Sequence, residues 1–344
     1  MAKGQLFGSS VTDSERQMNI LVTGAAGYIG SVVTEELIKE GHSVVALDNL
    51  GQGHREAVEP KAVFVQADLG DSEVLNDLFR RYQIEVVMHL AAESLVEHSM
   101  TDPGRYFRNN VIYGVNLLDI MLKYGARKLV FSSSAAVYGQ PEKIPIEETD
   151  QTIPVNPYGE SKLIFERILH WYSHAYGLRF ISLRYFNAAG ATERLGESHD
   201  PETHLIPNVL KVALGQQEYI PIFGMDYPTN DGSCIRDYLH VLDIAKAHIL
   251  ALNYLDKSGA NKVYNLGCSE GYSVIEVVET ARQVTGAKIP TLIHSRRQGD
   301  PAVLIASSKL VKSELGWQPM HSHLETIIES DWQWQKNHPY GYKK

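Results

Sequence analysis

The chain has 344 residues, of which 44% are hydrophobic and 21% are charged, and its formal net charge is −9. This length exceeds what one hydrophobic core usually supports, so more than one region is expected. The acidic balance argues against a protein that coats nucleic acid or an anionic membrane.

Cysteine content and hydropathy narrow the class of protein further. Cys234 and Cys268 form no CxxC pair, which argues against a disulfide scaffold or a zinc ribbon. No stretch approaches the roughly 20 apolar residues of a membrane span. The polar segment 1–17 lacks the apolar core of a secretion signal, so we expect a disordered extension or a cloning remnant there. A cytoplasmic location is the expectation that follows.

Short apolar runs alternate with amphipathic stretches in the first half of the chain. The runs lie at residues 19–23, 44–47, 63–65, 86–90 and 128–131, and a helix is expected from 29 to 40. Apolar strands joined by crossover helices form a parallel sheet that is covered on both faces. We therefore predict an α/β protein whose residues 18–186 form a Rossmann-type doubly wound parallel sheet.

The regular alternation of apolar runs and amphipathic stretches ends after Asn187. Loops lengthen, and four prolines fall between Pro201 and Pro228. This pattern predicts a smaller, mixed α/β substrate-binding region that occupies most of residues 187–344. Residues 237–255 again show a strand followed by a helix, and we expect them to return to the first region.

The first turn carries a glycine pattern typical of dinucleotide-binding loops. Gly24, Gly27 and Gly30 form GxxGxxG directly between the first strand and the first helix. Glycine lets the backbone turn tightly and approach a pyrophosphate, whose charge the helix N-terminus then meets. Asp48 ends the second strand, where a carboxylate accepts hydrogen bonds from ribose hydroxyls and repels a 2′-phosphate. NAD is favoured over NADP, and a plain loop aspartate is the alternative for Asp48.

Two interpretations stand for Asp68, which follows the third apolar run. Its carboxylate can accept a hydrogen bond from the adenine amino group of a dinucleotide. It can equally cap a helix that begins near Ser72.

Tyr158 and Lys162 lie four residues apart at the start of an amphipathic stretch. On a helix this spacing places both side chains on one face. A free tyrosine has a pKa of about 10, and a nearby ammonium together with a positive nicotinamide ring lowers that pKa. Ser134 follows the fifth run, at the edge where open α/β sheets bind ligands, and can share the reacting proton. These three residues predict nicotinamide-dependent chemistry on an alcohol.

These motifs, in this order, resemble the extended short-chain dehydrogenase/reductase family. Finer phrases resemble the UDP-galactose (UDP-glucose) 4-epimerases of that family, over almost the whole chain from about Met18 to Tyr342. These phrases are LDNL at 47–50, FSSS at 131–134, LRYFN at 183–187, IRDY at 235–238, YNLG at 264–267 and RRQGD at 296–300. The resemblance implies an isomerase that interconverts UDP-galactose and UDP-glucose through a 4-keto sugar, with tightly bound NAD.

The resemblance also assigns roles to individual residues. Tyr158, Lys162 and Ser134 form the expected catalytic set. The expected NAD contacts are Gly24, Gly27, Tyr28, Ile29, Gly30, Asp48, Asn49, Asp68, Leu69, Leu90, Ala91, Ala92, Asn109, Ser134, Tyr158, Lys162, Tyr185 and Phe186. The expected UDP-sugar contacts are Ser134, Tyr158, Asn187, His204, Leu205, Phe223, Arg236, Arg297, Asp300 and Leu304.

Within the second set, Arg236 and Arg297 suit the diphosphate, because guanidinium donors match phosphate oxygens bidentately. A surface ion pair is the alternative for each arginine. The resemblance places Asn187 near the phosphate and sugar, and Phe223 in the uracil pocket.

Some positions depart from the family pattern. Dehydratases of the family carry Asp-Glu where this chain has Ala135 and Ala136, so dehydration is not expected. Ser94 replaces a lysine that contacts the cofactor in many relatives, and His204 replaces an asparagine that contacts the nucleotide. Leu304 lies where the family sets the size of the sugar pocket. Epimerisation of UDP-N-acetylhexosamines or a UDP-uronate is therefore the open alternative.

The helix that carries Tyr158 packs in a dimer interface in this family, so a homodimer is expected. Its apolar residues are expected to face the partner; they are Leu163, Ile164, Ile168 and Leu169. His170 and His174 mimic half a metal site, but no third ligand is near in sequence and the chemistry needs no metal. We expect no metal, nucleic acid or membrane partner. Residues 332–334, Trp-Gln-Trp, are interpreted as packing of the final helix.

Overall fold

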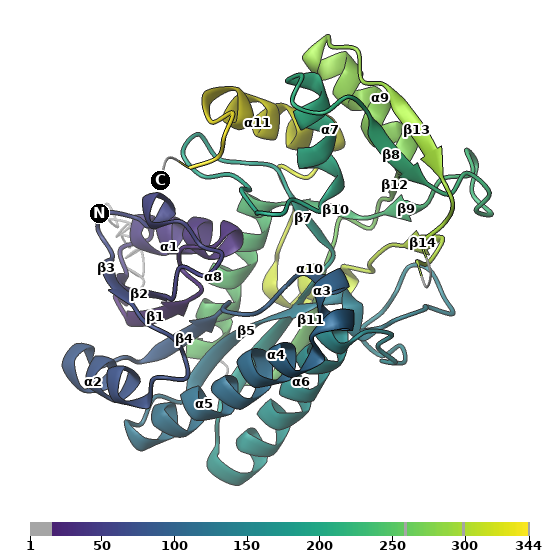
Figure 1. Cartoon of the computed structure of the whole chain (residues 1–344). Coiled ribbons are helices and arrows are strands. Elements are labelled where there is room, and N and C mark those ends of the chain that lie inside the picture. Colours follow the sequence, from purple (N-terminus) through teal and green to yellow (C-terminus); the bar gives the residue numbers. More distant parts are fainter. Residues whose placement is uncertain (1–15, 258–259, 298–299, 343–344) are drawn as a thin grey trace, which may run out of the picture.

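A computed structural model describes residues 16–257, 260–297 and 300–342, so most of the expected N-terminal extension lies outside the described residues. A seven-stranded sheet in the order β11-β6-β5-β4-β1-β2-β3 forms the centre of the molecule (Figure 1). Every neighbouring pair in it is parallel. Its strands are β1 (Asn19–Thr23), β2 (Ser43–Asp48), β3 (Val63–Gln66), β4 (Val86–His89), β5 (Lys128–Ser134), β6 (Arg179–Tyr185) and β11 (Lys262–Leu266).

Helices cover both faces of this sheet (Figure 1). The helices on one face are α1 (Tyr28–Lys39) and α8 (Val241–Lys257); those on the other are α2 (Ser72–Tyr82), α5 (Tyr113–Lys123) and α6 (Pro157–Tyr176). Successive strand residues point to opposite faces, so Ile20 of β1 joins the first core and Leu21 joins the second. Both faces need apolar residues, which explains the continuous apolar runs. The predicted Rossmann-type α/β architecture is confirmed.

Short elements connect these layers. They are the single-turn helices η1 (Arg55–Ala57) and η3 (Ala135–Val137), the helices α3 (Val96–Thr101), α4 (Pro103–Phe107) and α10 (Lys309–Leu315), and the π-helical turn η2 (Arg108–Ile112). Strand β5 extends through Ser134, so this serine is the last residue of the strand rather than the residue after it.

A second region lies over one end of the large sheet (Figure 1). Its helices α7 (Leu205–Ala213), α9 (Val274–Thr285) and α11 (Leu324–Asn337) share a separate core. Its short strands are β7 (Asn187–Ala189) with β10 (Tyr238–His240), β8 (Ile220–Phe223) with β13 (Thr291–His294), and β9 (Ile235–Arg236) between β12 (Tyr272–Ser273) and β14 (Val303–Leu304). Trp334 of α11 is 2% exposed, in line with the packing role predicted for it.

The chain returns to the first region between these elements. The helix α8 follows β10 directly and packs along α1. The return continues further than residues 237–255, because β11 pairs with β6 and forms the outer strand of the large sheet. The short strand β11 contains Tyr264, Asn265 and Leu266 of the phrase YNLG, and the sequence analysis did not predict it as part of this sheet.

Candidate active site

A cavity of about 970 Å³ opens at the carboxyl ends of the central strands. Residues that follow β1 and β4 line it, and these two strands are neighbours at the point where the strand order reverses. Open α/β sheets bind ligands at this position. Every residue of the two expected contact sets lines the cavity except Leu304.

The glycine turn between β1 and α1 forms one wall of this cavity. Gly24 has φ +72°, and a Cβ there would lie 2.6 Å from the backbone nitrogen of Ala91. A Cβ on Gly30 would lie 2.0 Å from the carbonyl oxygen of Gly24. Gly27 is the N-cap of α1 and supplies no side-chain cap to the helix N-terminus. The turn therefore leaves backbone N–H donors for an anionic group such as a pyrophosphate.

The carboxylate of Asp48 is held at the end of β2 by two backbone donors. Ala26 N–H donates to Oδ2 at 2.9 Å and Leu50 N–H donates to Oδ1 at 2.8 Å. Burial raises the pKa of this carboxyl group, while the two hydrogen bonds oppose that shift. Each oxygen keeps a second acceptor position, which suits a pair of ribose hydroxyls.

Asp68 also lines the cavity, and Asn49 Nδ2 donates to its Oδ2 at 2.8 Å. The alternative interpretation of Asp68 as a helix cap is wrong. The N-cap of α2 is Asp71, whose Oδ1 accepts from the N–H groups of Glu73 and Val74, each at 3.1 Å. The cap belongs to Asp71 because it directly precedes the first helical residue, Ser72.

The start of α6 brings Tyr158 to the end of β5. Asn156 caps the helix by accepting a hydrogen bond from Gly159 N–H at 2.8 Å, and proline occupies the first turn. Gly159 lies directly against η3, since a Cβ there would come within 2.4 Å of the carbonyl oxygen of Ala136. This close approach brings the start of α6 to the end of β5, where Tyr158 and Ser134 both line the cavity.

Burial dominates the electrostatics of this set. Burial raises the pKa of Tyr158, and the hydrogen bond from Ser134 opposes this shift only in part. Lys162 Nζ lies 5.8 Å from the centroid of the tyrosine ring and donates to the carbonyl oxygen of Ser132 at 2.8 Å. Lys162 is itself 3% exposed, and burial lowers its pKa to about 7. The contribution expected from a bound nicotinamide stays a prediction.

A buried ion pair fixes α6 against the sheet below the reacting groups. Arg184 Nη2 of β6 lies 2.6 Å from Glu166 Oε2 of α6, and the two side chains are 7% and 3% exposed. Ser133 Oγ of β5 donates to Glu166 Oε1 at 2.6 Å. This contact ties α6 to the two strands that end at the cavity.

The two arginines expected at the diphosphate line the side of the cavity that the second region provides. Arg236 Nη2 lies 2.5 Å from Asp300 Oδ1. Arg297 lies with its guanidinium carbon 4.2 Å from the centroid of the Phe223 ring and its Nη1 3.6 Å from Glu97 Oε1. Both arginines therefore have carboxylate partners, as the ion-pair alternative requires, and both also face the cavity. A base that stacks on Phe223 must use the other ring face or displace Arg297.

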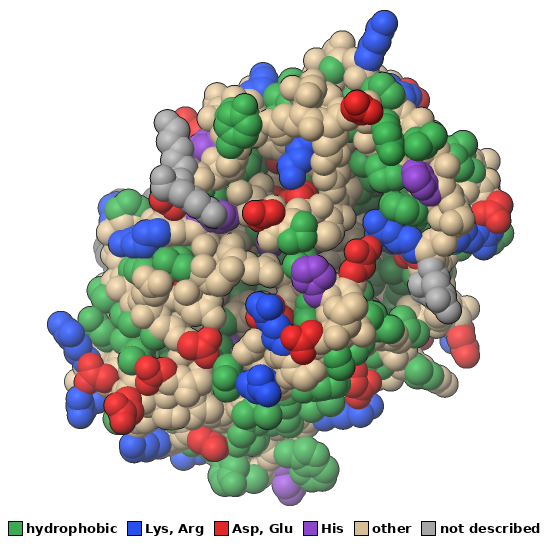
Figure 2. Space-filling view, viewed as in Figure 1, with side chains coloured by type: hydrophobic (Ala, Val, Ile, Leu, Met, Phe, Trp, Pro, Cys, Tyr) green, Lys and Arg blue, Asp and Glu red, His purple; other side chains and the backbone are tan. Residues whose placement is uncertain are grey.

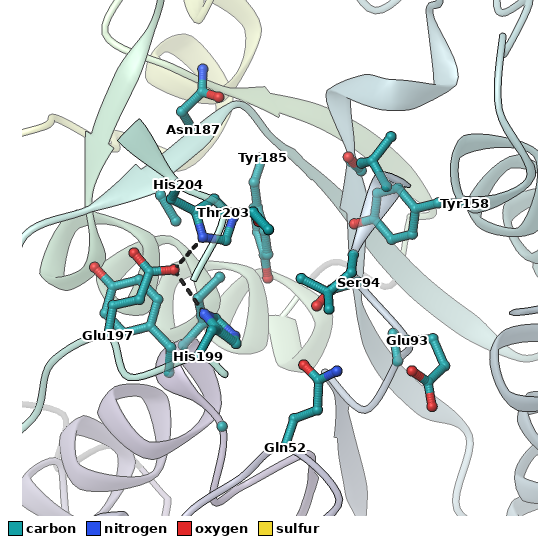
Figure 3. A pocket seen from close by; sticks show the side chains of 18 of the residues that line it. Gln52, Glu93, Ser94, Tyr158, Tyr185, Asn187, Glu197, His199, Thr203 and His204 are labelled. Carbon is teal, nitrogen blue, oxygen red and sulfur yellow. Dashed lines mark hydrogen bonds and ion pairs between the residues drawn. The ribbon is translucent and has the colours of Figure 1, made fainter. Parts of the chain in front are cut away.

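Further polar groups line the cavity between these walls (Figure 3). Asn187 Nδ2 donates to the carbonyl oxygen of Asp237 at 2.9 Å. Ser94 lies on the Tyr158 side of the cavity, and His204 and Thr203 lie on the opposite side. His204 is the N-cap of α7, directly before Leu205.

Sequence reasoning missed three ionisable residues in this wall, Glu197, His199 and Glu202. They join His204 in a cluster whose ligand-type atoms all lie within 4.8 Å of one another. A recognisable signal was present, because the pattern Glu-x-His occurs twice within residues 197–204.

Leu304 is the one expected contact residue that lies outside the cavity lining. This residue pairs with Arg236 across β14 and β9, and its side chain packs against a small core that contains Val137 and Phe186. Leu304 does not line the cavity. The side chain is half-buried beside this core. Its influence on the size of the sugar pocket stays a prediction.

The helix α6 also needs a correction. Leu163 and Leu169 are 4% and 0% exposed and lie in the cores of their own chain, so they do not face a partner. Ile164 and Ile168 are half-buried. On this helix Trp171 is 72% exposed.

Among the residues that the structure describes, no helix combines the length and apolar character needed to cross a membrane.

Comparisons with known proteins agree with this geometry. The model of the NAD-dependent epimerase/dehydratase family matches residues 20–267. A UDP-glucose 4-epimerase from Halalkalibacterium halodurans is 53% identical over 94% of this chain and 98% of its own length. A crystal structure of a UDP-glucose 4-epimerase is 50% identical, with a TM-score of 0.93 over 95% of this chain and all of the other.

A further solved structure carries ligands in its description. The UDP-glucose 4-epimerase from Bifidobacterium longum in complex with NAD⁺ and UDP is 35% identical, with a TM-score of 0.89 over 94% of this chain and 100% of the other. The identity over nearly the whole chain and the match of the family model lead to one conclusion: this chain belongs to the NAD-dependent epimerase/dehydratase family.

Proposed function

We propose that this chain interconverts UDP-glucose and UDP-galactose by inverting the configuration at C4 of the hexose, with NAD as a tightly held cofactor. The observation that carries the proposal is the placement of Ser134 and Tyr158 in the same cavity as the glycine turn. The relatives named as UDP-glucose 4-epimerases, each similar over almost its full length, support this substrate.

The residues of the cavity fit NAD on structural grounds. Gly24 and Gly30 form a tight turn in which a Cβ would clash with neighbouring backbone atoms. The uncapped start of α1 suits the pyrophosphate, and Asp48 suits the adenosine ribose. When bound, NAD supplies a nicotinamide that takes up the C4 hydrogen with its electron pair and returns it on the opposite face of the sugar.

Tyr158 is the group that we assign to the proton of the sugar O4 hydroxyl. Its hydroxyl faces the cavity and contacts Ser134, so the two side chains can share that proton as it leaves O4 and as it returns. Lys162 lies one helical turn after Tyr158. Its Nζ donates a hydrogen bond to the carbonyl oxygen of Ser132, and this bond fixes the lysine against the end of β5.

Two side chains favour epimerisation over dehydration. Ala135 and Ala136 form η3 directly after Ser134, at the positions where dehydratases of the family place an acid pair. A methyl group cannot protonate a leaving hydroxyl, so the intact 4-keto sugar must be reduced again. The UDP portion is assigned to Arg236 and Arg297, whose donors match phosphate oxygens.

The direct test is to incubate the purified chain with UDP-galactose and no added cofactor, and to measure UDP-glucose by chromatography. Formation of UDP-glucose is the expected result, because NAD that stays bound is regenerated in each turnover. UDP-N-acetylgalactosamine and a UDP-uronate are the comparison substrates. Turnover of one of these without turnover of UDP-galactose would overturn the substrate assignment.

We further propose a homodimer that forms through the face of α6 and its neighbours. Trp171 of α6 and Ile112 of η2 are 72% and 60% exposed, and α6 contacts η2. Hydrophobic side chains gather over the lower part of the molecule in Figure 2, where Figure 1 places α5 and α6. Large exposed apolar patches commonly mark protein interfaces. The mass in solution, measured by light scattering, tests this proposal.

The division of the chain near residue 187 into an NAD-binding region and a UDP-sugar-binding region is also a proposal. Residues 18–186 supply the glycine turn and the reacting set, and most of the cavity wall expected to contact UDP comes from residues 187–300. A cytoplasmic location is proposed on the free thiols of Cys234 and Cys268, which suit a reducing compartment.

A further inference from the structure

The wall of the cavity opposite Tyr158 contains a cluster of two carboxylates and two imidazoles. The cluster consists of Glu197, His199, Glu202 and His204, and one ligand atom from each lies within 4.8 Å of the other three. All four residues come from the segment that runs from Glu197 to the N-cap of α7. Figure 3 shows the imidazoles of His199 and His204 turned toward the same oxygen of Glu197.

Three of the distances between these ligand atoms are short enough for hydrogen bonds. Glu197 Oε1 lies 3.0 Å from His199 Nδ1 and 2.7 Å from His204 Nδ1. His204 Nδ1 also lies 2.9 Å from Glu202 Oε1. A zinc ion with ligand bonds of about 2.0–2.2 Å needs tetrahedral ligands about 3.4 Å apart. Opening these three contacts by about half an ångström would bring them to the ligand spacing of an N₂O₂ site.

Charge and burial give a second, independent argument. The side chains of Glu197 and Glu202 are only 4% and 2% exposed. Among the ion pairs of the described residues, neither carboxylate is paired with a lysine or an arginine; their cationic partners are histidines. A buried carboxylate is costly unless it is paired or coordinates a metal.

We propose that Glu197, His199, Glu202 and His204 bind one divalent transition-metal ion of the Zn²⁺ class, which fixes the cavity wall in front of α7. Two carboxylates and two neutral imidazoles neutralise a dication, and imidazole favours Zn²⁺ over Mg²⁺ or Ca²⁺. The site is structural. The reacting groups Ser134, Tyr158 and Lys162 do not belong to it, so the chemistry at C4 needs no metal.

The surroundings of the cluster are consistent with a fixed loop. His54 Nε2 lies 2.7 Å from the carbonyl oxygen of Ser198, which joins this segment to the chain after β2. Gly196 packs directly on Trp334, since a Cβ there would lie 2.2 Å from the indole. A metal bound by residues 197–204 would therefore connect the start of α7 to residues 196–198, which already contact His54 and Trp334.

The test uses the full chain after treatment with a chelator and is independent of the proposed epimerase activity. Titration with ZnCl₂ in a calorimeter is expected to show one Zn²⁺ per chain, with a submicromolar Kd and a higher Tm. Removing an outer hydrogen-bond partner of a metal ligand costs up to about 100-fold in affinity. We expect His199→Asn to weaken the Kd by more than that, because it removes a ligand.

The matched control is the double variant His170→Asn/His174→Asn, which removes two exposed histidines at helical spacing on α6. It is expected to bind Zn²⁺ like the parent chain. Parent-like binding by His199→Asn, or absence of stoichiometric binding by a folded parent chain, would overturn the proposal. The latter result would show that ion pairs between protonated histidines and the two glutamates hold the cluster together without a metal.

Co²⁺ binding to the parent chain keeps the proposal testable where a variant fails to fold. Tetrahedral N₂O₂ coordination predicts visible absorption bands for bound Co²⁺, which disappear when Zn²⁺ displaces the Co²⁺. Octahedral spectra, or preferential binding of Mg²⁺, would contradict the assigned ion class. In the turnover assay, metal removal is expected to raise KM rather than lower kcat, because the cluster lines the cavity away from Tyr158.

Discussion

The hydroxyl of Tyr158 experiences two opposite effects on its pKa. Burial raises the pKa and the hydrogen bond with Ser134 lowers it. A buried phenol that keeps its proton in the free chain is a poor base, so activation must come with the bound cofactor and substrate. This arrangement limits proton transfer to the loaded cavity.

Replacing Tyr158 with phenylalanine removes the proton acceptor and little else. A positioned acid–base group contributes about 10²- to 10⁴-fold to a rate, and we expect Tyr158→Phe to lower kcat by that amount while NAD stays bound. The measurements are turnover of UDP-galactose and the absorbance of released NAD. Tyr176→Phe, an exposed position on the same helix, is the control and should keep the parent rate. Retention of full activity by Tyr158→Phe would refute the assigned base.

Among the single residues of the candidate site, those that belong to short local motifs could be predicted from the sequence. The glycine turn, Asp48 and the Tyr158–Lys162 pair each depend on short spacing along one element. The packing of Leu304 could not be predicted, because it depends on the pairing of β14 with β9. The same holds for the pKa of Tyr158, which depends on burial beneath several elements.

The ion pair between α6 and β6 holds the catalytic helix on the sheet. Glu166→Gln leaves the guanidinium of Arg184 buried without its charge partner, and breaking such a pair typically costs about 3–5 kcal/mol. We expect the free energy of unfolding to fall by that amount, as measured by urea denaturation. The control is Glu36→Gln in the exposed pair with Lys39, where the change should stay below about 1 kcal/mol. Equal effects of the two substitutions would contradict the role given to the buried pair.

The close contact of α1 with the end of β1 admits only glycine. A Cβ at position 30 would lie 2.0 Å from the carbonyl oxygen of Gly24, so Gly30→Ala must push α1 away from the turn. We expect this variant to be purified without NAD, as judged by its absorbance spectrum after denaturation. At Gly104 a Cβ would meet only Asp102 Oδ1 at 3.9 Å, and Gly104→Ala should retain the cofactor. NAD retained by Gly30→Ala at the parent level would show that the turn tolerates the side chain.

Elements with strong apolar runs were predictable, and short paired strands were not. The runs of β1, β2, β4 and β5 are apolar because both faces of the sheet are covered. The strands β7, β9, β12 and β14 have only two or three residues each, too few to show a period. The helix α6 was located correctly, but tertiary packing decided which of its residues are buried.

Across the whole molecule, three buried histidines make stability depend on pH. Burial lowers the pKa of His89 to about 3, and those of His240 and His248 to about 4. The unfolded chain takes up protons on these groups below a pH of about 6.5, whereas the folded chain does not. Their contribution to stability is therefore complete above about pH 6.5 and is lost as the pH falls toward 4.

His248→Gln tests this dependence. The imidazole lies between Tyr185 OH at 2.7 Å and the carbonyl oxygen of Ile244 at 3.0 Å, and glutamine cannot titrate. Urea midpoints at pH 7.5 and pH 5 should differ less for His248→Gln than for the parent chain. The exposed His174→Asn should keep the parent difference. An unchanged difference in His248→Gln would show that this histidine does not contribute to the acid dependence.

The position of β11 has a consequence for synthesis. Strand β6 lies between β5 and β11, and β11 is made only after the strands β7 to β10 and the helices α7 and α8. Until residues 262–266 leave the ribosome, one edge of β6 presents unpaired N–H and C=O groups, and such an edge is a template for pairing with another chain. The nascent protein must therefore protect this edge, by transient packing or by a chaperone. Fragments that end before Lys262 would keep the edge open and are expected to aggregate.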